Sequence, residues 1–574
     1  MKKTHAEKSR KLPLYTRLPS YFILLFIVIM PLLAVPVTIT LTSAELTVVP
    51  NSDGTFTDYT QHFREMFLFA SAVGLILFHL GERIFPDKPL PSPVVREKSM
   101  RLPLILCGAY LLLAVISSVF SEHSDIAFRG IASENEGIAA IIGYVTLFLA
   151  AYVYMRRKML LLLPYAALIC AGIISVMFII EGISGTEMTQ LLFGITDQRL
   201  GTALLFGNSI ACGDICVMLL PVLIVAGLHE ERTHLKALFF VAGGILLCVI
   251  FTTFSTTAFI GTCAVFTLVI FTVICSRKTL LCRRNILSVI MVVPMALMLV
   301  ISPESSLFAI DKQVTGGGAY SPEKSWGLTD IRMEGSVLAL KNERAELSIK
   351  LTNEDNAVIS GNGQLLTELS DGSVTLDGEF SPVTITLSGR LLQLDLGYED
   401  TIEFETTGGA LSYIGINGYL VPELTQSAFP ELSHLYGFAT GRGHTWLSSI
   451  PMLKDSIIIG GGAGQYAFRF PHNDIVGMLN THGSAAVIND KPHSMYLGTA
   501  IAYGIPALIV MLALIAVSIK RGLHCILKSS AYSGIFISVI CYIIMGIAND
   551  SSVVYTPLFW IFAGTISATI SEDT

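Results

Sequence analysis

Charged residues are scarce in this chain of 574 residues. Asp, Glu, Lys and Arg make up only 14%, whereas hydrophobic residues make up 52% and the mean hydropathy is +0.65. Soluble globular proteins carry about 25% charged residues, so this scarcity excludes a soluble enzyme and a disordered chain. The net charge of −7 excludes a nucleic-acid binder of the basic type. We therefore expect a membrane protein without nucleic-acid partners.

Cysteine is missing from the long polar stretch 304–491, which must fold without disulfides. Cys212 and Cys216 lie four residues apart in an apolar run. They could form a metal pair, but two small buried residues explain the spacing better. No Cys/His spacing indicates zinc, and the loops lack an Asp-x-Asp motif. We expect neither a metal nor a cofactor.

Long apolar runs predict a mainly α, polytopic transmembrane protein with about twelve spans. The first run follows a basic N-terminus but is too long for the core of a signal peptide, so we interpret it as a span. Only TTFSTTA separates the seventh run from the eighth, and a re-entrant pair is the alternative there. The runs cover 21–41, 66–82, 101–120, 137–155, 159–180, 203–228, 236–254, 257–275, 285–303, 494–518, 531–548 and 552–569.

The positions of Lys and Arg predict the orientation. With the N-terminus inside, 23 of the 37 basic residues fall in inside segments, whereas the short outside loops hold only Arg64, Arg129 and Arg199. We therefore expect both termini in the cytoplasm and the large polar loop on the outer, extracytoplasmic face of the membrane.

That large loop has two parts. From about 330 to 421, polar and apolar residues alternate between Gly, Asn and Asp breaks, which predicts antiparallel strands in a small β-sandwich. The sequence 440–453 then predicts a helix start. GGGAG at 460–464 lacks the Lys-Ser/Thr of a nucleotide-binding loop, so we interpret it as a flexible turn. The expected domains are 1–303 (nine spans), 304–440 (the extracytoplasmic β-rich insert), 441–492 (an outer loop) and 493–574 (three spans).

Three ionisable residues are expected at the outer membrane surface, where such residues are candidates for function. Arg199 opens the sixth span, and Arg442 lies where the outer domain returns to the membrane. His493 is predicted to begin the tenth span, with Pro492 at a first helical position and Asp490 as N-cap.

Two arginines and a histidine at this depth fit glycosyl transfer from a lipid-linked diphosphate. Arginine holds phosphate oxygens with two hydrogen bonds, and histidine can take a proton from a sugar hydroxyl. Simpler explanations are a snorkelling anchor for Arg199, a surface or ion-pair arginine for Arg442 and a surface histidine for His493. Three further histidines have no metal-ligand spacing and are interpreted as loop residues: His444, His472 and His482.

Three ordered motifs resemble the O-antigen ligase and O-antigen polymerase family of bacterial envelope glycosyltransferases. They are RLGTALLFGNSIA, GRGHTWLSSIPMLKDSIIIGGGAGQY and PHSMYLGTAIAYGIPAL. Ser494 and Ala502 stand where that family has Asn and Glu. The matching residues are Arg199, Gly201, Thr202, Gly441, Arg442, Trp446, His493, Tyr496, Leu497 and Gly504.

The resemblance implies a GT-C-like, metal-independent, inverting enzyme in the plasma membrane of a bacterium. Its donor would be an undecaprenyl-diphosphate-linked glycan, and its acceptor a glycan or another hydroxyl-bearing molecule. His493 would activate the acceptor, while Arg199 and Arg442 would bind the diphosphate. The β insert is not a usual part of this family. It could bind the acceptor, bind a partner or serve as a spacer.

Two other functions compete with this one. A transporter or flippase of lipid-linked glycans usually has ionisable residues at the bilayer midplane and symmetric halves. Here the predicted spans hold almost no central charge apart from Asp214, and no symmetry is visible. A receptor anchored by its helices would not need twelve spans. We therefore expect a membrane glycosyltransferase in contact with lipids.

Overall fold

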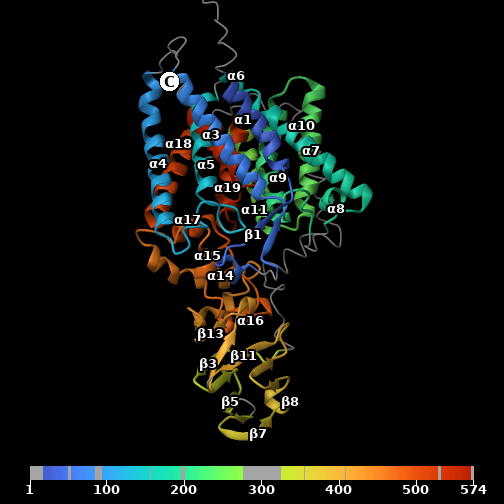
Figure 1. The fold of residues 1–574 in the computed structure, drawn as a ribbon. Helices are drawn as coiled ribbons and strands as arrows, with labels where there is room; N and C mark the ends of the chain where they lie inside the picture. The colour runs from blue at the N-terminus through green and yellow to red at the C-terminus, as the bar shows by residue number, and fades with distance from the viewer. Residues whose placement is uncertain are drawn as a thin grey trace, which may run out of the picture.

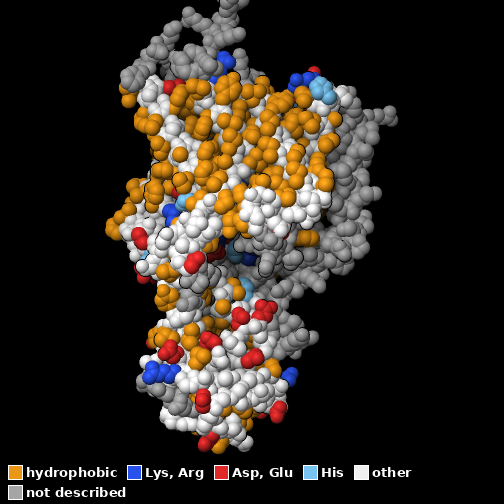
Figure 2. Space-filling view, turned by 45° about the vertical axis from the view of Figure 1, so that its right-hand side comes forward, with side chains coloured by type: hydrophobic (Ala, Val, Ile, Leu, Met, Phe, Trp, Pro, Cys, Tyr) orange, Lys and Arg blue, Asp and Glu red, His pale blue; other side chains and the backbone are white. Residues whose placement is uncertain are grey.

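The computed structural model describes residues 17–49, 53–84, 94–155, 157–195, 201–275, 325–353, 356–407, 409–527 and 532–569. It has a helical body and two β-sheets that project from one end of the helices (Figure 1). We call this end of the body the sheet end. On the face shown in Figure 2, hydrophobic side chains cover the helical body, whereas charged side chains lie mainly at its ends and on the sheets.

Seven described helices are long and apolar enough to cross a membrane, and four more are apolar but shorter, so the chain is a membrane-embedded helical protein. The predicted span 285–303 lies outside the described residues. The long helices are α3 (His62–Ile84), α4 (Val94–Val119), α7 (Leu163–Ser184), α9 (Ser209–His229), α10 (Thr233–Thr252), α11 (Thr256–Cys275) and α18 (Ile505–Leu527). The shorter ones are α1 (Leu18–Ile29), α5 (Ile138–Tyr154), α19 (Ser533–Met545) and α20 (Thr556–Thr569).

Two predicted spans have the wrong bounds. The run 21–41 leaves the α-helix at Ile29, because Pro31 follows within a 3₁₀ turn, and its end forms strand β1 (Val37–Thr40), which pairs with β2 (Thr55–Asp58). The run 494–518 breaks at Gly504 into α17 (Met495–Tyr503) and α18. Gly504 has φ of +91°, and a Cβ there would lie 2.6 Å from the carbonyl oxygen of Ile458. Only glycine fits this break.

Helix α9 lies at the centre of the helical body. Of the residues in its apolar 18-residue segment, 94% are buried. The helix packs against α10, α11 and α19. Cys212 and Cys216 are fully buried on it, and no cluster of metal-ligating residues occurs within the described ranges. Helix α5 packs against α20 and α3.

The two projecting sheets are antiparallel, as the alternating sequence predicts. The strand orders are β3-β4-β5-β6-β7 and β13-β12-β11-β10-β9-β8, and buried side chains of both sheets form one apolar cluster. The prediction of a strand-rich insert is confirmed. The strands are β3 (Asp330–Glu334), β4 (Val337–Lys341), β5 (Glu346–Asn353), β6 (Asn356–Gly361), β7 (Gln364–Ser370), β8 (Gly372–Thr375), β9 (Thr384–Ser388), β10 (Leu391–Asp395), β11 (Ile402–Thr407), β12 (Ala410–Ile414) and β13 (Leu420–Val421).

Short helices connect the sheets to the helical body. They are α14 (Arg442–Ser449), α15 (Tyr466–Arg469) and α16 (Ile475–His482). Asn480 of α16 donates to the carbonyl of Leu328 at 2.7 Å, before the first strand of the insert. Asn473, just before α16, donates to the carbonyl of Glu423 at 2.9 Å, after the last strand. The chain segments that enter and leave the sheets are therefore both tied to the region of α16.

Candidate functional site

Arg442 is the first residue of α14 and is held by an unusual turn. Ala439, Thr440 and Gly441 have φ of 51°, 64° and 87°, three successive residues in the left-handed region. This region is unfavourable for a β-branched residue such as Thr440. Such strain often occurs at functional sites, where the surrounding structure maintains it. The turn fixes the position at which the Arg442 side chain leaves the backbone.

The Arg442 guanidinium is buried but poorly paired. Its Nη1 donates to the carbonyl of Ala439 at 3.2 Å and to the hydroxyl of Thr440 at 3.1 Å. Its Nε is buried without a partner in the described chain. Burial lowers the pKa of Arg442, while the charges of Asp550 and Asp214 partly oppose this shift. A buried cation with an unused donor can bind an anionic group.

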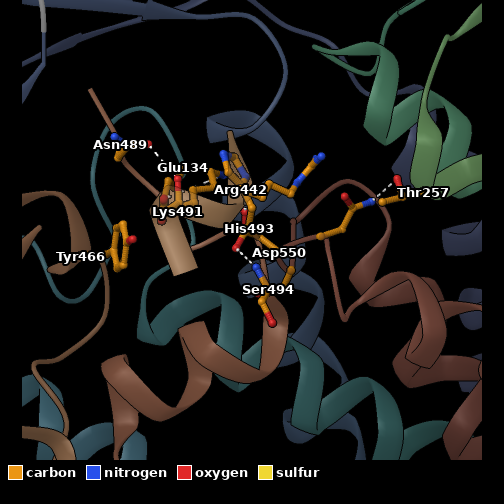
Figure 3. A network of polar contacts seen from close by, with 12 residues as sticks. Glu134, Thr257, Arg442, Tyr466, Asn489, Lys491, His493, Ser494 and Asp550 are labelled. Atoms are coloured by element: carbon orange, nitrogen blue, oxygen red, sulfur yellow. Dashed lines mark hydrogen bonds and ion pairs between the residues drawn. The ribbon is translucent and has the colours of Figure 1, made fainter. Parts of the chain in front are cut away.

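His493 is hydrogen-bonded to Asp550 close to Arg442 (Figure 3). Its Nδ1 lies 3.0 Å from Oδ2 of Asp550, and the main-chain N–H of Ser494 donates to Oδ1 of the same carboxylate at 3.1 Å. Asp550 belongs to the segment between α19 and α20, and its own carbonyl accepts from the Tyr555 hydroxyl at 2.7 Å. The carboxylate thus fixes the orientation of the ring, and a proton on Nδ1 leaves Nε2 as the base.

The predicted helix start at His493 is wrong. Helix α17 begins at Met495 with Ser494 as its N-cap residue, and His493 precedes it with φ of 50°. Neither Asp490 nor Pro492 caps the helix, because both lie outside it. His493 therefore lies in the loop before α17, and its imidazole is 39% exposed.

A group of charged side chains continues from Asp550 along the sheet end. Lys491 Nζ lies 4.0 Å from Oε1 of Glu134, and Glu136 accepts from the Ser551 hydroxyl at 2.7 Å. Burial lowers the pKa of Lys491, but the charges of Glu134 and the other carboxylates outweigh this and raise it overall. Burial raises the pKa of both Glu134 and Glu136. The loop between α4 and α5 therefore contributes to the site.

The prediction that the three other histidines are loop residues is wrong for His444 and His482, which lie in helices. His444 lies in α14 and is fully buried, with Nε2 3.2 Å from Oδ2 of Asp474, the N-cap residue of α16. His482 is the last residue of α16. His472 lies in a turn and its Nε2 accepts from the main-chain N–H of Asn489 at 3.0 Å, while burial lowers its pKa to about 4. The contact between His444 and Asp474 joins α14 to the start of α16.

The GGGAG segment is not a flexible turn. The main-chain N–H groups of Gly461 and Gly462 donate to the carbonyls of Ile501 and Ala502, both at 2.8 Å. Gly460 donates to the Ser117 hydroxyl of α4 at 3.2 Å, and a Cβ at Gly460 would lie 2.3 Å from the carbonyl carbon of Ala502. The glycines allow close packing between α4 and α17.

The structure brings two of the three predicted residues to one place. Arg442 and His493 both face Asp550, the first through its charge and the second through direct contact. Arg199 lies outside the described residues. Just after it, the main-chain N–H of Thr202 donates to the carbonyl of Thr252 at 2.9 Å, at the turn between α10 and α11.

Four residues of the site were missed in the sequence: Asp550, Lys491, Glu134 and Glu136. All four lie in short segments that border apolar runs, and two of them stand in the acidic sequence SENEG. Ionisable residues at such borders are candidates by default, and this signal could have identified them.

Comparison with models of known protein families gave no match, and comparison with curated proteins gave none.

Proposed function

We propose that this protein is a membrane glycosyltransferase of the O-antigen ligase and polymerase type. The proposal depends on one observation, the His493–Asp550 pair beside the incompletely paired Arg442 at the sheet end. It includes twelve spans, a β-sandwich formed by the two sheets, and a bacterial plasma membrane with the sheet end outside and both termini inside. The donor is an undecaprenyl-diphosphate-linked glycan, and the acceptor is a glycan or another hydroxyl-bearing molecule.

The reaction joins an acceptor hydroxyl to the anomeric carbon of the donor. As the new C–O bond forms, the bond from the anomeric carbon to the diphosphate breaks, and the anomeric configuration inverts. Nε2 of His493 takes the proton from the hydroxyl, and Asp550 stabilises the resulting imidazolium. The leaving lipid diphosphate gains negative charge, which Arg442 stabilises together with Arg199. An arginine clamp can serve in place of a divalent ion, so we expect activity without metal.

The test is transfer in proteoliposomes that contain a lipid-diphosphate oligosaccharide and candidate acceptors. We expect His493→Ala to reduce kcat by about 10²–10⁴, the usual contribution of a general base. We expect Arg442→Gln to reduce it by about 10²–10³, as for the loss of one transition-state donor. His434 and Arg344, both exposed, provide the matched controls His434→Ala and Arg344→Gln.

Several results would contradict the proposal. Wild-type rates in His493→Ala would remove the base, and loss of activity in EDTA would require a metal. Movement of the lipid-linked glycan across the bilayer without a new glycosidic bond would identify a flippase. For the orientation, Ser373→Cys on β8 should react with an impermeant thiol reagent in intact cells, because Ser373 is exposed on the sheets. Protection of this cysteine would place the sheets inside.

A further inference from the structure

A buried acidic residue next to the candidate site has no role in the proposed chemistry. Asp214 stands in the second turn of α9 and is fully buried. An ionisable residue within a membrane-spanning helix is costly to bury and is a candidate for function by default. The contacts of Asp214 indicate what that function is.

One carboxylate oxygen of Asp214 is fixed by the segment that carries Asp550. The side-chain nitrogen of Asn549 donates to Oδ2 of Asp214 at 2.6 Å and to the Thr257 hydroxyl of α11 at 2.8 Å (Figure 3). Both N–H groups of this amide are thus used. The Asn549 carbonyl accepts from the main-chain N–H of Met495, the first residue of α17, at 2.8 Å. Asp214 is therefore tied to the residue next to Asp550 and, through it, to the start of α17.

The other carboxylate oxygen of Asp214 has no donor. Oδ1 is buried, and no hydrogen-bond partner within the described residues reaches it. The two oxygens of Asp550, in contrast, are bonded to His493 and Ser494. A buried carboxylate without donors is costly unless a cation lies nearby. The unused oxygen therefore points to a partner of positive charge.

Arg442 is the cation that matches this oxygen. The charges of Arg442 and Asp214 act on each other, and Nε of Arg442 is buried without an acceptor in the described chain. An unused donor and an unused acceptor thus belong to two opposite charges. Without a ligand, Asp214 supplies negative charge that a buried arginine needs. An anion that binds Arg442 enters the field of Asp214 and is repelled by it.

We propose that Asp214 is the resting counter-ion of Arg442 and weakens the binding of an anionic ligand there. The inference rests on the proposed function only for the identity of the anion, a lipid diphosphate. In that reaction the donor enters with its diphosphate and the lipid diphosphate leaves as product. A fixed negative charge near Arg442 favours release of this product, so that the next donor can bind.

The first measurement is binding of farnesyl diphosphate to the full-length protein in lipid nanodiscs, with farnesol as the uncharged probe. Asp214→Asn keeps an acceptor for Asn549 and removes the charge. We expect it to lower the Kd for farnesyl diphosphate about tenfold, equivalent to about 1.4 kcal/mol, and to leave farnesol binding unchanged. A purely structural role predicts weaker binding. A Kd within twofold of wild type, or a higher one, would overturn the inference.

A second substitution tests whether Asp214 acts through Arg442. In the Arg442→Gln background, Asp214→Asn should restore no binding of farnesyl diphosphate, because the cation is missing. A tenfold gain in that background would show that the charge acts elsewhere and would contradict the proposal. Asp214→Ser removes the same charge with a smaller side chain, and it replaces Asp214→Asn in both tests if the latter does not fold.

A matched control is available in another buried carboxylate. Asp58 is 7% exposed and accepts from the main-chain N–H of Gln61 at 2.7 Å. Asp58→Asn also removes one buried negative charge, and it should leave the Kd for farnesyl diphosphate within twofold of wild type. Thermal unfolding of each variant reports whether it folds. Equal gains in Asp58→Asn and Asp214→Asn would indicate a general effect of net charge and would refute the specific role of Asp214.

Kinetics of transfer separate this inference from the proposed function. If both hold, Asp214→Asn lowers the KM for the lipid-diphosphate donor and strengthens inhibition by the lipid-diphosphate product. If His493→Ala abolishes transfer while Asp214→Asn leaves the Kd for farnesyl diphosphate unchanged, the counter-ion inference fails and the proposed function stands. If Asp214→Asn tightens binding as expected but wild type transfers no glycan, the proposed function fails and the counter-ion stands.

Discussion

Asp550→Asn gives the sharpest test of the catalytic proposal, because the substitution keeps the shape of the side chain and changes only its hydrogen bonding. Asp550 accepts from two donors, Nδ1 of His493 at 3.0 Å and the main-chain N–H of Ser494 at 3.1 Å. An asparagine side chain has one acceptor oxygen and one NH₂ group. When the oxygen accepts from Ser494, the NH₂ group faces His493 and moves the ring proton to Nε2. His493 can then no longer accept a proton from the substrate.

The expected loss follows from this change of tautomer. General-base catalysis contributes about 10²–10⁴ to the rate. Because the His493 side chain is 39% exposed, water can partly replace the missing partner. We therefore expect kcat to fall by roughly 10²–10³, equivalent to about 3–4 kcal/mol in the barrier. Asp550 acts through His493, so KM for both substrates should stay close to wild type.

The assay is steady-state transfer in proteoliposomes, with thermal unfolding measured on the same samples. Asp377→Asn, an exposed residue between two strands, is the matched control. The double variant of His493→Ala with Asp550→Asn should lose little more activity than His493→Ala alone, because residues that act as a unit have non-additive effects. A kcat within threefold of wild type, or fully additive losses, would refute the proposed role of Asp550.

Two further predictions concern stability, and a third concerns transfer. Burial lowers the pKa of His472 to about 4, so stability should fall as pH drops from about 6.5 toward 4, where the unfolded chain binds the proton first. His472→Gln should flatten this dependence of the unfolding temperature, and an unchanged slope would argue against it. Lys491→Met should lower the unfolding temperature more at pH 8 than at pH 5, because protonation of Glu134 at low pH relieves the uncompensated charge; equal losses at both values would contradict the ion pair. Gly443→Ala should displace α14 and abolish transfer, because its Cβ would lie 1.8 Å from the carbonyl oxygen of Leu435, whereas Gly182→Ala on α7 meets nothing within 4 Å and should be tolerated.

Much of the fold follows from periodicity that a single sequence contains. Apolar runs located the described long helices, and alternation over 330–421 located the strands, because both patterns depend on local spacing. The ends of the runs were less predictable. Hydropathy does not distinguish the helix that stops at Ile29 from the strand that follows it, nor does it detect the break at Gly504.

The candidate site was only partly predictable for a different reason. Arg442 and His493 stand out because they are isolated polar residues in recognisable motifs. Asp550 and Glu134 contribute through contacts between segments far apart in the sequence. The acidic character of a short loop gives no indication of which histidine or lysine it faces, and only the packing of α5, α17 and α20 determines these pairs.

The attachment of the sheets to α16 has a consequence for how such a protein can diversify. Since the peptide enters and leaves the insert beside a single short helix, the intervening hundred or so residues form a cassette whose two ends meet. Replacement of that cassette by another fold, or by a short linker, can change the binding partners of the projecting part of the protein. The residues around Asp550 would keep their positions.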